Sequence, residues 1–249
     1  MERCAQRILR MTVLIVGGTG ATGRLLVKQL LERGSEVIAI VRSPDNLPDE
    51  IRGHDRLRVV TASILDMAEA ELADLLRGCD AVASCLGHNL TFQGIFGQPH
   101  KLVTHAVKRL CLAIAANRPE RPVRFILMDT AGNSNRDIPE PITLGERCVM
   151  SRIRLVIPPH SDNESAADFL RTQIPHDDTA IEWVVVRPDT LTNETAVSAY
   201  EVVPSPMRSA VFNPGKTSRI NVAHFMADLL TDDDVWGRWH GNMPVIYNK

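Results

Sequence analysis

The chain has 249 residues, 28 of them basic and 30 acidic, so its formal charge is −2 at neutral pH. A charge this close to zero excludes bulk electrostatic attraction to nucleic acid or to an anionic membrane. Charged residues at 23% and hydrophobic residues at 44% are typical of a folded globular protein, and aromatics at 4% are too scarce for a base-stacking platform.

Nothing in the sequence indicates export or a membrane span. No apolar run approaches the roughly 18 residues that cross a bilayer, and the first ten residues lack the apolar stretch of a secretory signal. The five cysteines (Cys4, Cys79, Cys85, Cys111 and Cys148) are scattered and form no Cys-x-x-Cys pair. We therefore expect a cytoplasmic protein with free thiols and no metal site.

The first part of the chain alternates short apolar runs with helical patterns. The apolar runs, each expected to be a strand, are Thr12–Val16, Glu36–Val41, Leu57–Val60, Ala81–Cys85, Val123–Met128 and Ile181–Val186. Helical patterns cover Arg24–Arg33, Ala68–Leu76 and His100–Ala116. Apolar strands separated by helices are typical of a parallel sheet covered on both faces, so we predict an α/β fold, a doubly wound parallel sheet, built as one domain over residues 1–249.

The pattern loosens after residue 130. Thr143–Ile157 is compatible with a helix closed by two prolines, and the capping-box spacing from Ser161 to Glu164 predicts that another helix starts at Ser161. Residues 188–220 contain four prolines and look irregular. We expect them to form a small C-terminal substrate lobe, followed by a helix over Asn221–Leu230 and a strand over Pro244–Tyr247.

A glycine-rich segment, Gly17-Gly18-Thr19-Gly20-Ala21-Thr22-Gly23, joins the first strand to the first helix. In that context Gly17 permits a tight turn, Gly20 lets the backbone approach a pyrophosphate, and Gly23 lets the helix pack close to the sheet. The helix N-terminus then offers free N–H groups to the phosphates. The alternative is a plain strand–helix turn.

The end of the second strand indicates which dinucleotide binds. An NAD-selective site places Asp or Glu there to bind the ribose 2′-hydroxyl, whereas this chain reads Val41-Arg42-Ser43-Pro44. Arg42 can pair with a 2′-phosphate, and no carboxylate repels that phosphate. NADP (NADPH) is therefore the expected cofactor, unless Arg42 is simply an exposed surface residue.

With these motifs in place, the chain resembles the atypical short-chain dehydrogenase/reductase superfamily. Within it the chain is most similar to the NAD(P)H-binding branch that includes biliverdin reductase B, a flavin reductase, and NmrA-like proteins. The resemblance spans about residues 11–247 and is carried by GGTGATG at 17–23, VRSP at 41–44, SCLGHN at 84–89, MDTAGN at 128–133, VVVRPDTLT at 184–192 and SRINVAHFMADLL at 218–230.

The resemblance implies a Rossmann fold and a set of cofactor-binding residues. It implies that the pyrophosphate is held by Gly17, Thr19, Gly20, Ala21, Thr22 and Gly23, and the 2′-phosphate by Arg42. Leu86 and Gly87 would lie against the adenosine ribose and phosphates, Thr130 beside the nicotinamide, and Pro188, Thr190 and Leu191 beside its carboxamide. One departure concerns adenine: the family usually has Gly-Asp after the third strand, and this chain has Ala62-Ser63, so Ser63 would bind adenine more weakly than a carboxylate.

Usual short-chain dehydrogenases exchange a proton through a Tyr-x-x-x-Lys pair. The only tyrosines here, Tyr200 and Tyr247, do not begin such a pair, and residues 143–160 contain neither Tyr nor Lys. This disfavours an alcohol dehydrogenase or a sugar epimerase. A conjugated acceptor such as a flavin, a quinone or a tetrapyrrole can take its proton from water instead, as the resemblance to biliverdin reductase B implies.

Other polar residues are candidates for catalysis at the same edge of the sheet. His88 follows the fourth strand and His160 precedes a predicted helix, so each is either a proton donor or a surface histidine. Thr130 either holds the nicotinamide or a substrate oxygen, or caps its loop. Asp129, directly before it, is a substrate-binding carboxylate or, more simply, a loop cap.

Two functions are compatible with these residues. The first is an NADPH-dependent oxidoreductase that transfers hydride to a small conjugated acceptor. The second is a non-catalytic, NADP-sensing regulatory or scaffold protein of the NmrA-like type. In either case we expect a monomer or homodimer, with a small molecule as the enzyme's substrate and no nucleic-acid or membrane partner.

Overall fold

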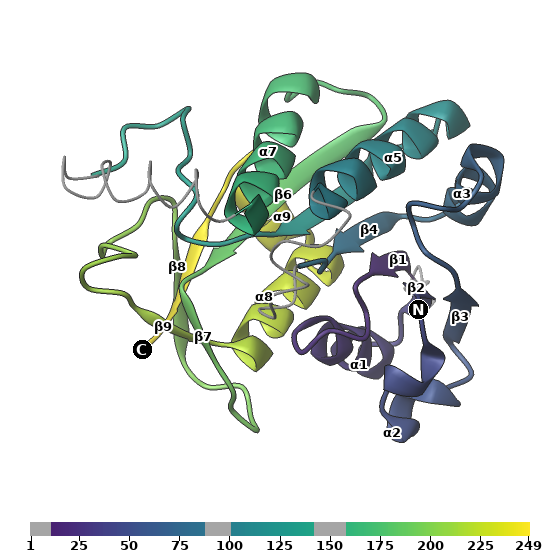
Figure 1. The fold of residues 1–249 in the computed structure, drawn as a ribbon, viewed down its shortest axis with the longest axis horizontal. Coiled ribbons are helices and arrows are strands. Elements are labelled where there is room, and N and C mark those ends of the chain that lie inside the picture. Colours follow the sequence, from purple (N-terminus) through teal and green to yellow (C-terminus); the bar gives the residue numbers. More distant parts are fainter. Residues whose placement is uncertain (1–10, 88–100, 142–157) are drawn as a thin grey trace, which may run out of the picture.

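The structure, a computed structural model, describes residues 11–87, 101–141 and 158–249, with the backbone alone for residues 158–160. Within these residues an eight-stranded sheet runs through the centre, in the order β3-β2-β1-β4-β5-β6-β10-β8 (Figure 1). Its strands are β1 Thr12–Val16, β2 Glu36–Val41, β3 Leu57–Thr61, β4 Ala81–Ser84, β5 Val123–Met128, β6 Ile181–Pro188, β8 Tyr200–Val203 and β10 Val245–Asn248. A separate pair joins β7 Thr190–Thr192 to β9 Lys216–Ser218.

Helices cover both faces of the sheet (Figure 1). They are α1 Gly23–Glu32, α2 Asp49–Arg52, α3 Glu69–Leu76, α5 Leu102–Asn117, α7 Pro158–Gln173, α8 Arg219–Thr231 and α9 Asp233–Trp239, with a short 3-10 turn, η1, at Pro44–Asn46. The predicted doubly wound α/β fold is therefore confirmed. None of the helices within the described ranges is long and apolar enough to cross a membrane.

Each strand of the sheet packs its alternate side chains into one of two cores. Leu14, Phe125 and Leu127 lie in the core under α3, α5 and α7. Ile15 and Ile126 lie in the opposite core, under α1 and α8. These side chains are fully buried, and each contributes roughly 1.5–3 kcal/mol by leaving water. Burial on both faces explains why the strands read as continuous apolar runs.

All neighbours in the sheet are parallel except β8, which is antiparallel to β10. The ladder pairs Val16 with Ile40 and with Ser84, and Met128 with Val186. The carboxyl ends of these strands consequently lie along one edge, where open α/β sheets bind ligands.

The second half of the chain differs from the sequence expectation. The helix predicted to start at Ser161 already includes Pro158, whose missing N–H costs nothing in a first helical turn. The helix predicted over 143–157 lies outside the described residues. The segment predicted to be irregular contains β7, β8 and β9, and an additional helix, α9, starts where the Asp232 carboxylate accepts the N–H groups of Asp234 and Val235.

Candidate functional site

Backbone hydrogen bonds continue the sheet past its strands and bring the predicted cofactor residues to one edge. The Cys85 N–H donates to Val16 O at 2.9 Å, and the Ala62 N–H to Val41 O at 2.9 Å. Farther along, the Ala131 N–H donates to Pro188 O at 2.9 Å. The segments that contain the glycine loop, Arg42, Ser63, Leu86, Thr130 and Pro188 are therefore neighbours along this edge.

Two glycines of the loop leave no room for a side chain. Gly17 has a φ of +78°, and a Cβ there would lie 2.5 Å from the Cys85 carbonyl oxygen. A Cβ on Gly23 would lie 2.1 Å from the Gly17 carbonyl oxygen. The loop is thus packed tightly between the end of β4 and the start of α1, the close approach that the sequence predicted.

Gly20 is different because it faces the surface. It is exposed, and a Cβ there would meet Gly17 O at 3.2 Å and then nothing nearer than Cys85 O at 3.9 Å. Thr22 precedes α1 as its N-cap residue but makes no side-chain capping bond. The backbone around Gly20, with Thr19 half-buried and Ala21 exposed, therefore presents an uncapped helix N-terminus, a suitable place for a phosphate.

Arg42 and Ser63 follow the two strands that flank the adenine side of such a site. Arg42 is exposed, and within the described part of the chain its guanidinium makes no hydrogen bond or ion pair. Ser63 is half-buried, and its carbonyl accepts the N–H groups of Asp66 and Met67 at 3.0 and 3.2 Å. Arg42 is thus a cation free to bind an anion, whereas Ser63 also shapes the turn toward α3.

The remaining predicted residues fall around β4, β5 and β6. Leu86 is half-buried against the core, and Gly87 is exposed. Half-buried Thr130 forms a tight turn in which its Oγ1 accepts the Gly132 N–H at 3.3 Å. Pro188 is buried beside this turn, with exposed Thr190 and half-buried Leu191 following it. His88 lies outside the described residues, as does the side chain of His160, whose backbone belongs to the first turn of α7.

A buried polar cluster beside Thr130 was only partly visible in the sequence. Asp129 Oδ1 accepts a hydrogen bond from Asn133 Nδ2 at 2.6 Å. Arg187, fully buried at the end of β6, donates to Asn133 O at 2.7 Å and pairs with Glu140 at 2.8 Å. The sequence did not predict that Arg187 and Glu140 belong to a buried cluster, because arginine and glutamate are mostly exposed in proteins. The one signal was that an arginine follows the apolar run of β6.

Burial has an electrostatic consequence for Asp129. Loss of water raises the pKa of its carboxyl group to about 7, although the Asn133 hydrogen bond, the Arg187 charge and the backbone N–H of Thr130 oppose that rise. A carboxyl group at the candidate edge therefore titrates near neutral pH, a property common among acids in active sites.

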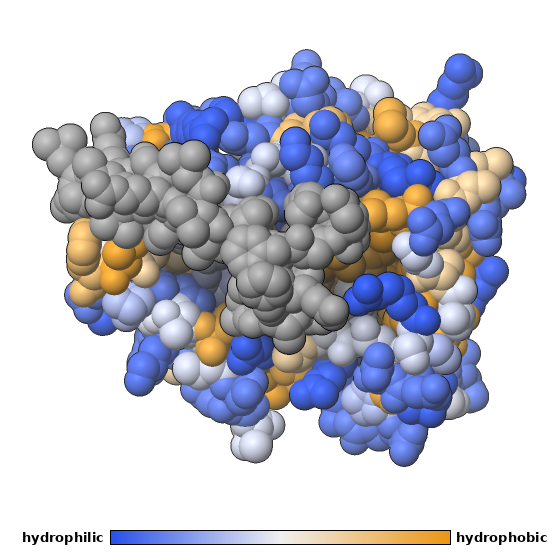
Figure 2. All heavy atoms as spheres, viewed as in Figure 1, coloured by the Kyte–Doolittle hydropathy of each residue, from blue (hydrophilic) through white to orange (hydrophobic). Residues whose placement is uncertain are grey.

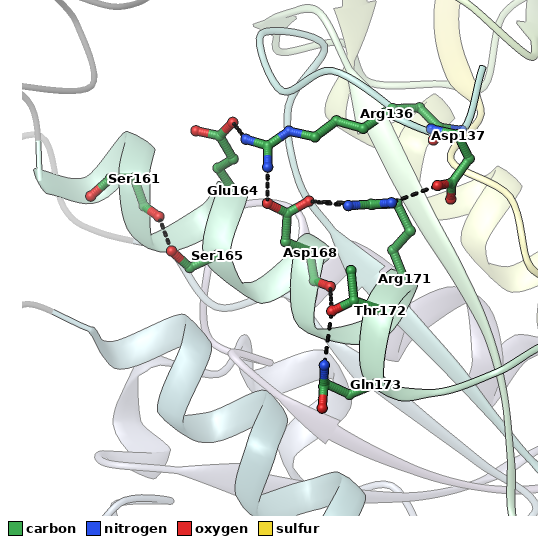
Figure 3. Close-up of polar contacts among 10 residues, drawn as sticks. Arg136, Asp137, Ser161, Glu164, Ser165, Asp168, Arg171, Thr172 and Gln173 are labelled. Atoms are coloured by element: carbon green, nitrogen blue, oxygen red, sulfur yellow. Dashed lines mark hydrogen bonds and ion pairs between the residues drawn. The ribbon is translucent and has the colours of Figure 1, made fainter.

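The loop after β5 is held against α7 by a surface network of ion pairs (Figure 3). Arg136 contacts Glu164 at 2.7 Å and Asp168 at 2.8 Å, and Arg171 contacts Asp168 at 3.3 Å and Asp137 at 2.5 Å. Single exposed pairs stabilise little, but a connected set restricts the loop at several points. The network therefore helps to hold the segment that contains Thr130.

The loop between β8 and β9, at the left of Figure 1, carries exposed apolar side chains. Met207 is 53% and Phe212 63% exposed, and Figure 2 shows apolar atoms in the same place. Both ends of the loop are anchored at the end of β6: Arg187 donates to Pro204 O at 3.4 Å, and the Gly215 N–H to Asp189 Oδ2 at 2.9 Å. The loop is therefore fixed to the candidate edge.

Comparison with known proteins identifies a family. A family model described as NAD(P)H-binding matches residues 17–233. Two curated relatives, the chloroplastic divinyl chlorophyllide a 8-vinyl-reductases of Cucumis sativus and Arabidopsis thaliana, are 37% and 33% identical over 83 and 82 residues. Each match covers 30% of this chain, and the chain spans only 20% of the length of either relative.

Similar solved structures cover nearly the whole chain. A short-chain dehydrogenase/reductase from Veillonella parvula, in complex with NADP, has a TM-score of 0.68 at 19% identity, covering 96% of this chain and 94% of its own. The oxidoreductase ylbE from Lactococcus lactis has a TM-score of 0.67 at 20% identity, with 96% and 91% covered. A proposed NADH-flavin reductase from Streptococcus pneumoniae has 0.64 at 18% identity, with 96% and 100% covered. At these identities the likeness establishes the Rossmann fold.

Proposed function

The chain belongs to the NAD(P)H-binding family of oxidoreductases, and from that premise we propose that it is an NADPH-dependent reductase of a small conjugated acceptor, such as a flavin or a quinone. The observation that carries the proposal is the uncapped N-terminus of α1, next to an exposed glycine and a free arginine. The nicotinamide supplies the hydride when it is bound, and the protein supplies position and electrostatics.

The residues at the edge fit a dinucleotide phosphate. The N–H groups at the start of α1 would bind the pyrophosphate, with Gly20 leaving room for it. Arg42 would bind the 2′-phosphate, which favours NADPH over NADH, and the similar Veillonella parvula protein was solved with NADP. Ser63 and Leu86 would lie along the adenosine half, and Thr130 and Pro188 along the nicotinamide half.

The choice of acceptor follows from the helix between β5 and β6. In the described part of α7, from Pro158 to Gln173, there is neither a tyrosine nor a lysine. Tyr200 instead donates its hydroxyl to Asp228 at 3.0 Å, between β8 and α8, and Tyr247 is buried in β10. Reduction of a simple ketone leaves a strongly basic alkoxide, which usual short-chain dehydrogenases protonate through the Tyr-Lys pair, whereas a conjugated acceptor delocalises the charge that it receives and can be protonated without that pair.

Two further observations favour a flat, apolar acceptor. The anchored loop that carries Met207 and Phe212 offers apolar surface next to the candidate edge. The curated relatives are named for reducing a vinyl group of a chlorophyllide, and one similar structure is proposed to be an NADH-flavin reductase. All of these named substrates are conjugated ring systems.

The test is NADPH oxidation by the purified protein with FMN, with a quinone such as menadione, and without an acceptor. We expect turnover with at least one acceptor, a lower KM for NADPH than for NADH, and little oxidation without an acceptor. Tight NADPH binding with no turnover would favour the NADP-sensing alternative. No NADPH binding would contradict the proposal altogether.

A further inference from the structure

Asp129 has one carboxyl oxygen that its surroundings leave unused. The side chain lies at the end of β5 and is 6% exposed. Its Oδ1 accepts the amide of Asn133 at 2.6 Å, but its Oδ2, like Oδ1 of Asn133, is buried without a hydrogen-bond partner among the described residues. A buried polar atom without a partner is costly, so its persistence needs an explanation, and a bound ligand is one. A loop cap requires only the oxygen that Asn133 already uses.

The charges around Asp129 leave it without a cation of its own. From β6, Arg187 is nearby, but this guanidinium is paired with Glu140 at 2.8 Å, and both side chains are almost completely buried. From α7, Glu164 adds negative potential, and its own partner is Arg136 at 2.7 Å. An ionised Asp129 would be an additional buried negative charge, so the neutral carboxylic acid is favoured below about pH 7.

The position of Asp129 matches the place where the reaction needs a proton. The Asp129 N–H continues the ladder to Val186 O at 2.8 Å, and strand alternation places its side chain on the face of Leu127, which α5 and α7 cover. The next residue is Thr130, the predicted neighbour of the nicotinamide. The acid thus faces the side of the sheet that α7, the described helix between β5 and β6, covers.

We propose that Asp129 is the catalytic acid of this site and donates its Oδ2 proton to the acceptor that has received the hydride. The inference rests on the proposed function, and it replaces direct protonation by water. The acceptor gains a hydride from NADPH and becomes an anion at oxygen or nitrogen. The O–H bond of Asp129 then breaks, the proton passes to that atom, and the remaining carboxylate regains a proton from solvent, so one acceptor, one NADPH and one proton give the reduced acceptor and NADP⁺.

The decisive variant is Asp129→Asn, because an amide reproduces the shape and hydrogen bonds of a neutral carboxyl group but has no proton to transfer. We expect kcat with the best acceptor to fall by ~10²–10⁴-fold, with KM for NADPH and NADP affinity in a fluorescence titration unchanged. The matched control is Asp177→Asn, which makes the same change on an exposed residue after α7 and should keep wild-type kcat.

A second readout does not depend on activity. Infrared difference spectra of the cofactor-free protein near pH 6 should show the carbonyl stretch of a protonated carboxyl group, and this band should be absent from Asp129→Asn. If that variant does not fold, the wild-type pH–rate profile decides: kcat must fall as pH rises through about 7, because the acid form is lost.

The outcomes separate this inference from the proposed function. Wild-type turnover together with an Asp129→Asn kcat within about threefold would overturn the acid role alone, as would a flat pH–rate profile. A missing infrared band would overturn it as well. Wild-type protein that binds NADPH but reduces none of the acceptors would overturn the proposed function and, with it, the acid role.

Discussion

Helices α1 and α5 come after β1 and β4, which are neighbours in the sheet. The two helices differ in whether a side chain caps their N-terminus. At α5 the Asp162 carboxylate, from α7, accepts the N–H groups of Val103 and Thr104 at 2.8 and 2.9 Å and the Thr104 hydroxyl at 2.6 Å. At α1 the N-cap residue, Thr22, makes no side-chain capping bond, and no other described side chain caps the first turn.

The difference shows when a helix N-terminus is a candidate site. Both helix N-termini carry positive potential, and each has first-turn N–H groups that need an acceptor. At α5 the chain satisfies them with its own carboxylate, and the result is a buried link between α5 and α7. At α1 the Arg24 and Leu25 N–H groups donate to the backbone oxygens of Gly20 and Thr22 at 3.0 Å, and no described side chain fills the space beside Gly20, where we propose that a phosphate binds. The difference comes from Asp162 on α7, which caps α5. Variants at the N-terminus of each helix can test it.

The largest effect on NADPH binding should come from filling the space at the N-terminus of α1. A valine at Gly20 would fill the space beside the α1 N-terminus, and its Cβ would lie 3.2 Å from Gly17 O and 3.9 Å from Cys85 O. Gly20→Val should therefore keep the fold and weaken NADPH binding by more than ~100-fold, or about 2.7 kcal/mol. Calorimetric titration and circular dichroism measure the two effects. Gly53→Val is the control, since a Cβ at Gly53 meets nothing within 4 Å. A Gly20→Val variant with intact structure and unchanged affinity would contradict the phosphate site.

A second prediction sharpens the comparison with Asp129, a buried carboxyl group that caps no helix. Its pKa is raised from 3.8 to about 7 on folding, so between these values the folded chain keeps a proton that the unfolded chain has lost. The free energy of unfolding should therefore decrease as pH rises from about 4 to about 7, by up to ~1.4 kcal/mol per pH unit, and level off above. Urea unfolding at several pH values measures it. Asp129→Asn should lack this contribution, and identical pH slopes for both proteins would refute the shift.

Removing the carboxylate that caps α5 should lower the free energy of unfolding and leave NADPH binding unchanged. Asp162→Ala removes the acceptor of two buried N–H groups and one hydroxyl, so we expect the free energy of unfolding to fall by about 2–4 kcal/mol. Asp162→Asn keeps one acceptor oxygen and should lose less. Urea unfolding measures the loss of stability, and NADPH titration measures cofactor affinity. A folded Asp162→Asn variant that has lost NADPH affinity would argue against separate roles for the N-termini of α1 and α5.

Arg42 tests the outer part of the open site. Arg42→Ala should weaken NADPH binding by ~1.5–3 kcal/mol, the value of a hydrogen bond to a charged group, and change NADH binding little. Titration of the variant with both cofactors supplies its own control. An equal loss for NADPH and NADH would rule out contact with the 2′-phosphate.

The smallest effects should come from the histidines. His88→Ala and His160→Ala should each keep most of kcat, and Thr130→Ala should act mainly by misplacing the nicotinamide. The pH–rate profile of NADPH oxidation measures this for each variant. A fall above ~10³-fold for either histidine, with loss of a pKa near 6–7, would identify that histidine as the acid.

Continuous patterns in the sequence were enough to predict the strands of the sheet other than β8, which lies in the segment expected to be irregular. Strands buried on both faces read as unbroken apolar runs, and predicted bounds such as Thr12–Val16 match those of β1. The predicted start of α7 was wrong. We expected Glu164 to complete a capping box at the helix start, but it lies in the second turn of a longer helix and pairs with Arg136. β6 continues through Arg187, where the apolar run stops but the pairing with β10 does not.

The polar cluster at the site depends on contacts that no local pattern contains. Asp129 could be proposed from the strand end alone. Its partners could not, because Asn133, Glu140 and Arg187 meet only when β5 pairs with β6 and the following loop folds back. The absence of a side-chain cap at α1 among the described residues was equally hidden, since a sequence does not show which N-terminus a distant carboxylate will cap.

The contacts of Arg187 also set an order for biosynthesis. Its guanidinium is shared among Asn133, Glu140, Pro204 and Met243. A ribosome that has just released β6 has not yet made the last two, so this arginine in a nascent chain still lacks its later acceptors. Helix α1 likewise lacks α8, to which Arg33 is joined through Asp228. Both the polar cluster beside Asp129 and the packing of α1 are therefore completed only after the C-terminal part of the chain has been made.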